Sequence, residues 1–266
     1  MSGYIKADFW QSMSGTYNSN EHQITDPNWK IIEDRYNNFE YKQDQIPKII
    51  HQIWLGGKIP DRYKKLCDSF KIMNPDWEYR LWTDEDVDKF GLINKKAFDL
   101  ASNYGMKSDI FRYEIIERFG GVYADTDFEC LKSLNDFIGC SFFSGLFFSK
   151  NPEIAFPNGL FGSTPNNPIL KDLILGINGI KSTNPYDIMN LTGPYYFGRI
   201  VMDYFLKDKN SDIILFPTDY AYSLPSSTRF NQTGIRFEDN IDLTKVYRNN
   251  PNHYLLHYFH VSWQTW

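Results

Sequence analysis

The feature that most constrains the fold is an alternation of short apolar runs with segments of helical periodicity across residues 47–125. Residues 48–55 form an apolar run closed by two glycines, as expected of a buried strand that ends in a loop. Residues 60–73 have the character of a helix, and residues 77–82 alternate like a second strand. Strands joined by helical crossovers predict a sheet whose neighbouring strands run parallel.

The same alternation places one aspartate at the end of a strand. Helices are predicted over residues 95–103 and 107–119, and two glycines separate the second helix from a short strand at residues 122–124. Asp125 therefore follows the carboxyl end of a strand, where mainly parallel sheets bind their ligands. The later part of the chain predicts further strands at 142–148, 213–216 and 254–260 and further helices at 167–177 and 195–206.

These elements predict an α/β fold, a single domain with a mixed, mainly parallel sheet flanked by helices. Residues 1–45 are polar and lack a sustained period apart from a short helix near residues 29–36. We therefore expect an N-terminal extension over 1–45 and one catalytic domain over 46–266.

Charge and hydropathy argue against nucleic-acid binding and against a membrane span. The net charge is −5 and there is no long basic run, so the electrostatic pattern of a nucleic-acid-binding protein is missing. No stretch approaches the roughly 20 apolar residues that a membrane span requires. We expect no nucleic-acid partner and no membrane span, and with no signal peptide in the sequence we expect a cytoplasmic protein.

Two aspartates, separated by a single residue, follow the third predicted strand. On an extended segment, Asp125 and Asp127 point to the same side, where both carboxylates can reach a hard cation. A buried pair of carboxylates without a cation or a proton would be costly. Because no cluster of His or Cys competes for a softer metal, the residues favour Mn²⁺ or Mg²⁺.

A second polar pair lies on the helix that precedes this strand. Asp109 and Arg112 are three residues apart and share a face, whereas the apolar residues at intervals of four form another face suited to the core. The polar face can point at a ligand. Cleavage of a bond between a sugar and a diphosphate releases an anion, and a divalent cation can neutralise that anion without a protonating acid.

Three segments together resemble one family. They are Ile46 to Gly56, Asn74-Pro75 with Trp82, and Ser108 to Asp127. In these the chain resembles the DXD-containing glycosyltransferases of the sugar-binding-region family, which includes the yeast initiation-specific alpha-1,6-mannosyltransferase and, more distantly, the large clostridial glucosylating toxins. Weaker similarities occur at Asn158, at 192–194 and at 257–263.

The resemblance implies a GT-A-like fold, a retained anomeric configuration and a set of site residues. It places Trp54 against the nucleotide base with Ile53 beside it, Asp109 and Arg112 on the donor sugar, and Asp127 on the metal. Asp125 would lie near the ribose, the sugar or the metal. The closing Ser262-Trp263 pair would lie by the metal and the diphosphate, with Ser262 as a further metal ligand.

Three other residues leave alternatives open. His257 and His260 fit either ordinary positions in a half-buried terminal strand or contacts to phosphate. Asn158, between Pro157 and Gly159, fits either a turn or a contact to the donor or the acceptor.

We expect a retaining, metal-dependent glycosyltransferase that moves a hexose or an N-acetylhexosamine from a UDP-sugar or GDP-mannose to a hydroxyl acceptor, such as a glycan or glycoprotein. One alternative is a non-catalytic module that binds carbohydrate or nucleotide. Another is a phosphatase of the haloacid-dehalogenase type. The phosphatase is disfavoured because its threonine two places after the second aspartate is absent and because the motif stands near mid-chain.

Overall fold

A computed structural model describes residues 7–13, 26–147, 156–177, 180, 184, 187–207, 212–224 and 241–260, without the side chains of 241–244. Within these ranges, no helix is both long enough and apolar enough to cross a bilayer. The strands are β1 (Ile49–Ile53), β2 (Glu78–Trp82), β3 (Gly121–Ala124), β4 (Phe128–Cys130), β5 (Phe142–Gly145), β6 (Leu160–Ser163), β7 (Ile213–Phe216) and β8 (Leu255–His257). The α-helices are α1 (Asn28–Asn38), α2 (Asp61–Met73), α3 (Asp84–Phe90), α4 (Lys95–Leu100), α5 (Tyr104–Phe119), α6 (Pro168–Ile177), α7 (Ile188–Leu191), α8 (Pro194–Lys207) and α9 (Ile241–Arg248).

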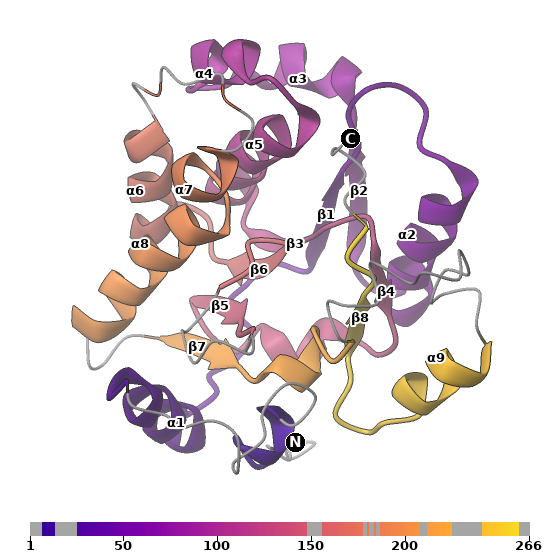
Figure 1. The fold of residues 1–266 in the computed structure, drawn as a ribbon, viewed down its shortest axis with the longest axis vertical. Coiled ribbons are helices and arrows are strands. Elements are labelled where there is room, and N and C mark those ends of the chain that lie inside the picture. Colours follow the sequence, from indigo (N-terminus) through magenta and orange to yellow (C-terminus); the bar gives the residue numbers. More distant parts are fainter. Residues whose placement is uncertain are drawn as a thin grey trace.

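Six of these strands form the central sheet, in the order β2-β1-β3-β6-β5-β7. β1 runs parallel to β2 and β3, and β5 runs parallel to β7, whereas β6 is antiparallel to both of its neighbours. Helices α5, α6, α7 and α8 lie on one side, and α2 lies on the other with a separate antiparallel pair, β4 and β8 (Figure 1). The predicted α/β class, with a mixed, mainly parallel sheet flanked by helices, is confirmed.

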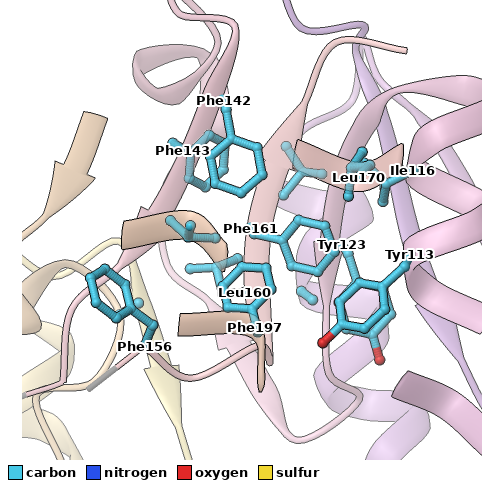
Figure 2. Packing of buried hydrophobic residues seen from close by; sticks show 14 of the residues in the cluster. Tyr113, Ile116, Tyr123, Phe142, Phe143, Phe156, Leu160, Phe161, Leu170 and Phe197 are labelled. Atoms are coloured by element: carbon cyan, nitrogen blue, oxygen red, sulfur yellow. The ribbon is translucent and has the colours of Figure 1, made fainter. Parts of the chain in front are cut away.

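No pattern in the sequence predicted β6, although this strand occupies the centre of the aromatic core (Figure 2). The ring of Phe161 lies with its centroid 5.2 Å from that of Phe197 and 5.8 Å from that of Tyr123. Tyr113 and Phe142 complete the contacts, at 6.0 and 6.3 Å. Aromatic pairs at these separations stabilise a core beyond the area that they bury.

Helix α5 is mostly buried, and its two ends follow from sequence. It begins at Tyr104, before the predicted start, because the Asn103 side chain accepts a hydrogen bond of 2.9 Å from the Met106 amide. It ends where Gly120 takes a positive φ of 64°. Ten of its residues are buried, including Asp109 and Arg112, so each polar group among them needs a partner within the protein.

His51 lies in β1, and both of its ring nitrogens make contacts within the protein. Its Nε2 lies 3.0 Å from the Gly120 carbonyl oxygen, and its Nδ1 accepts a hydrogen bond of 3.1 Å from Trp82 Nε1. Burial lowers the pKa of His51 to about 3. The neutral imidazole, protonated on Nε2, therefore ties β1 to β2 and to the start of β3.

The N-terminal residues pack on the same core as the rest of the chain. Phe9, Trp29 and Tyr36 are buried members of one hydrophobic cluster, and α1 packs against β7 at the edge of the sheet (Figure 1). The boundary at residue 46 between an extension and a catalytic domain stays a prediction.

Gly121, the first residue of β3, gives a test of this packing. It has a φ of +98°, and a Cβ added there would lie 2.4 Å from the Ile49 carbonyl oxygen. We expect Gly121→Ala to lower the free energy of unfolding by at least about 2 kcal/mol, because backbone strain and steric overlap add. Gly57, with a φ of +103° and open space around it, is the control. Gly57→Ala should cost only about 1 to 2 kcal/mol. Equal losses in urea denaturation would contradict the packing of β3 on β1.

Candidate active site

A cavity of about 440 Å³ lies beyond the carboxyl ends of β1 and β3. Its lining includes Ile53 and Trp54 at the end of β1, the turn from Asp125 to Asp127, and the polar face of α5. The loop before β6 and the segment after β8 complete this part of the wall. Parallel strands place ligand sites at this edge of a sheet, and the predicted residues in the described part of the chain gather there.

Asp125 and Asp127 lie in a turn, not on the extended segment that the sequence suggested. The Phe128 amide donates to the Asp125 carbonyl oxygen at 3.2 Å, which reverses the chain between β3 and β4. The Asp125 amide donates to the Gly159 carbonyl oxygen at 2.8 Å, and Tyr123 Oη donates to Asp125 Oδ1 at 2.6 Å. Both aspartates nevertheless line the cavity.

The segment after β8 reaches the second aspartate. Pairing of β4 with β8 sets Phe128 opposite His257, whose Nε2 lies 3.2 Å from Asp127 Oδ1. Phe259 has a left-handed φ of 53°, uncommon outside glycine, and the next residue, His260, donates its amide to Asp127 Oδ2 at 2.7 Å. Burial raises the pKa of Asp127, but the contacts with His257 and His260 together more than offset this, so the pKa is lowered overall.

These residues suit a hard cation. Asp125, Asp127 and His257 each offer one ligand atom, and the three atoms lie within 4.8 Å of one another. Ligands of an octahedral ion at about 2.1 Å are separated by about 3 to 4.2 Å, so small adjustments would close the site. Two carboxylates with one imidazole fit Mn²⁺, which prefers oxygen ligands. His257 is then the candidate third ligand, a role that the sequence analysis did not assign.

Asp109 and Arg112 form a buried ion pair at the side of the cavity. Arg112 Nη2 lies 3.2 Å from Asp109 Oδ1, and Nη1 lies 3.2 Å from Asp125 Oδ1. The remaining guanidinium donors face Ser108 and the Asn158 carbonyl oxygen. Burial would lower the pKa of Arg112, but Asp125 and its other acidic neighbours raise it overall, so the guanidinium stays charged. Burial raises the pKa of Asp109 to about 6.

Asn158 is buried and binds within this cluster. Its Nδ2 donates to Asp109 Oδ1 at 2.8 Å and to Tyr113 Oη at 2.9 Å. Asp109 Oδ2 accepts from Thr192 Oγ1 at 3.1 Å. Thr192 was not predictable as a partner of Asp109, because 83 residues separate them and no local pattern links them.

An aromatic wall and an apolar wall flank the polar groups. On one side Trp54 is partly buried, with its ring centroid 4.8 Å from that of Tyr63. The ring centroid of Tyr63 lies 5.6 Å from that of His260. On the other side Ile188, Met189, Pro194 and Tyr195 bring no charge. Apart from Trp54 and His260, the residues of these two walls were not predicted from sequence, since apolar and aromatic residues on helices are typical of a core. Ser262 and Trp263 lie outside the described residues.

Comparison with known proteins places these residues in context. Residues 60–143 match the family described as glycosyltransferase sugar-binding region containing DXD motif. An uncharacterised glycosyltransferase of Acanthamoeba polyphaga mimivirus is 30% identical over 184 residues, which is 66% of this chain and 73% of that protein. The mannosyl phosphorylinositol ceramide synthase SUR1 of Saccharomyces cerevisiae is 31% identical over 71% of this chain and 52% of its own length.

A third relative is the initiation-specific alpha-1,6-mannosyltransferase of Candida albicans, 28% identical over 62% of this chain and 55% of that protein. The chain thus spans about half the length of these two fungal relatives. Among solved structures, the PaToxG glycosyltransferase aligns with a TM-score of 0.52 at 21% identity, over 66% of this chain and 76% of that one. This likeness confirms the GT-A-like fold.

The buried Asp109 predicts a pH-dependent stability. Its pKa is about 6 in the folded protein and 3.8 without the protein environment, so the folded state binds the proton more tightly. Its contribution to stability is therefore full below about pH 4 and is lost as the pH rises through 6. Relative to the wild type, Asp109→Asn should gain about 2 kcal/mol of unfolding free energy between pH 4 and pH 7. Urea denaturation at both pH values, with Asp88→Asn at an exposed position of α3 as control, checks this. A gain no larger than the control's would contradict it.

Proposed function

The chain belongs to the glycosyltransferases that share the DXD-containing sugar-binding region, and on that basis we propose that it transfers a hexose or an N-acetylhexosamine from a nucleotide-diphosphate sugar to a hydroxyl acceptor. The donor is a UDP-sugar or GDP-mannose, and the configuration at the anomeric carbon is retained. A divalent cation, Mn²⁺ or Mg²⁺, assists the reaction.

One observation carries this proposal. Asp125, Asp127 and His257 offer their ligand atoms within 4.8 Å of one another. The same cavity is lined by the aromatic wall of Trp54 and Tyr63 and by the buried carboxylate of Asp109. A nucleoside diphosphate sugar has the matching parts: a base that stacks, a diphosphate that needs positive charge, and a sugar whose hydroxyls donate hydrogen bonds.

Each part of the cavity then has a role. Trp54 receives the base, and Asp109 accepts a hydrogen bond from a hydroxyl of the donor sugar. Asp125, Asp127 and His257 would hold the cation, which when bound would supply positive charge to the departing diphosphate. The His260 amide keeps Asp127 Oδ2 in place, and Arg112 keeps Asp125 and Asp109 apart while cancelling part of their charge.

The acceptor approaches along the uncharged wall of Met189 and Tyr195, both of which are exposed. An uncharged wall favours the ring of a sugar, as in a glycan or a glycoprotein. Two fungal relatives carry mannosyl and mannosyltransferase in their names, which makes GDP-mannose the first donor to test. The cytoplasmic location stays a prediction.

Metal-dependent release of nucleotide tests the reaction. The purified protein is incubated with UDP- and GDP-sugars, with Mn²⁺ or with EDTA, and free nucleotide is measured. We expect release from one donor, abolished by EDTA and reduced at least about 100-fold by the Asp125→Ala, Asp127→Ala double substitution, because charge stabilisation of the leaving group is lost. Asp88→Asn serves as the control for a distant carboxylate. Release that persists in EDTA and in the double variant would reject the proposed metal role.

Nucleotide binding tests Trp54. We expect Trp54→Ala to weaken binding of the free nucleotide by about 1 to 3 kcal/mol, because stacking on the base is lost. Calorimetry with the nucleotide of the active donor measures the change. Trp10→Ala, at a partly buried tryptophan of the N-terminal segment, is the matched control and should leave the affinity unchanged. Equal affinities for the wild type and Trp54→Ala would place the base elsewhere.

A further inference from the structure

Four buried residues form a closed ring of hydrogen bonds behind the cavity wall. Asn158 Nδ2 donates to Asp109 Oδ1 at 2.8 Å and to Tyr113 Oη at 2.9 Å. Tyr113 Oη donates to the Thr192 carbonyl oxygen at 2.6 Å, and Thr192 Oγ1 donates to Asp109 Oδ2 at 3.1 Å. The ring joins α5, the loop before β6 and the loop between α7 and α8.

The two oxygens of Asp109 differ in what they can still accept. Oδ1 faces both Asn158 Nδ2 and Arg112 Nη2, which occupy its two lone pairs. Within the described ranges, the hydrogen bond of Oδ2 comes from Thr192. Oδ2 therefore keeps one lone pair for a ligand, and the Thr192 hydroxyl decides the direction in which that oxygen points.

Thr192 is itself held firmly and does not line the cavity. Its side chain is fully buried, its amide donates to the Ile188 carbonyl oxygen at 3.1 Å, and its own carbonyl oxygen accepts from Tyr113. Met189 and Tyr195, which do line the cavity, stand three residues before and three residues after it. Thr192 thus connects the uncharged wall to Asp109 while remaining out of reach of a ligand.

We propose that Thr192 is a positioning residue for the transfer reaction: its hydroxyl aims Asp109 Oδ2 at a hydroxyl of the donor sugar and fixes that oxygen relative to the Met189 and Tyr195 wall. This inference rests on the proposed function, since it takes the cavity to bind a nucleotide-diphosphate sugar. A threonine that only satisfies a buried carboxylate is the competing explanation, and the two differ in their kinetic consequences.

Thr192→Val tests the inference because it keeps the shape of the side chain and the backbone carbonyl while removing the hydroxyl. We expect kcat for nucleotide release from the active donor to fall about 10- to 100-fold, as for a lost hydrogen bond to a charged group, with KM nearly unchanged. Calorimetry should find the affinity for the free nucleotide unchanged, because Trp54 and the cation ligands are intact. Thr192→Ser retains a hydroxyl and should restore most of the activity.

A matched control separates this effect from a loss of packing. Thr218 is also fully buried, lies away from the cavity lining, and its hydroxyl contacts Met13 Sδ at 3.4 Å. Thr218→Val should leave kcat unchanged. Thr192→Ala, which also lacks the hydroxyl, replaces the valine variant if that variant does not fold.

The outcomes separate the two proposals. A wild-type protein that releases nucleotide, together with a Thr192→Val variant of unaltered kcat, would overturn the positioning role alone. The role would also fall if nucleotide affinity and thermal stability dropped in parallel with activity and Thr192→Ser failed to restore it. A wild-type protein that releases no nucleotide from any donor would overturn the proposed function, and the positioning role with it.

Discussion

A positive charge buried in α5 is the interaction on which the site depends. Arg112 is only 4% exposed, and an unpaired guanidinium at such a position would cost several kcal/mol. Asp109 and Asp125 compensate it from two sides, each at 3.2 Å, and its other donors are accepted by the Ser108 and Asn158 carbonyl oxygens and the Ser108 hydroxyl. The same contacts keep two carboxylates from different elements at a fixed separation. The buried guanidinium therefore holds the acidic side chains at this side of the cavity in place without a ligand.

Local patterns predicted the part of the fold that positions the first aspartate. The strands at β1, β2 and β3 and the helices between them follow from periodicity and from their closing glycines, so the place of Asp125 beyond a strand end was predictable. β6 was not. Its sequence is short and includes Gly162, whose missing side chain makes room for the Phe143 ring; a Cβ there would lie 2.2 Å from that ring. The glycine is explained only by its contact with Phe143 on β5. The local sequence around it therefore does not indicate a strand.

The residues of the candidate site likewise divide into those that local sequence predicts and those that it does not. Asp109 with Arg112, and Asp125 with Asp127, were identified because spacing on one element already brings each pair together. The turn that contains the two aspartates was not predicted, because two of the contacts that hold it come from distant segments: the Gly159 carbonyl oxygen accepts from the Asp125 amide, and the His260 amide donates to Asp127. For the same reason the sequence left the role of His257 open and did not connect Thr192 to Asp109.

The pairing of β4 with β8 also bears on the order in which the molecule folds. His260 and Asp127 are joined across 133 residues, whereas Ile49 of β1 pairs with Glu78 of β2 and Ile50 pairs with Val122 of β3, across 29 and 72 residues. Closing so long a loop costs more conformational entropy than joining adjacent elements, and contacts of large sequence separation slow folding. The cluster of carboxylates and imidazole therefore completes late, after the strands around β1. During refolding, secondary structure should return first, and the contacts of Asp127 with His257 and His260 should lag behind it.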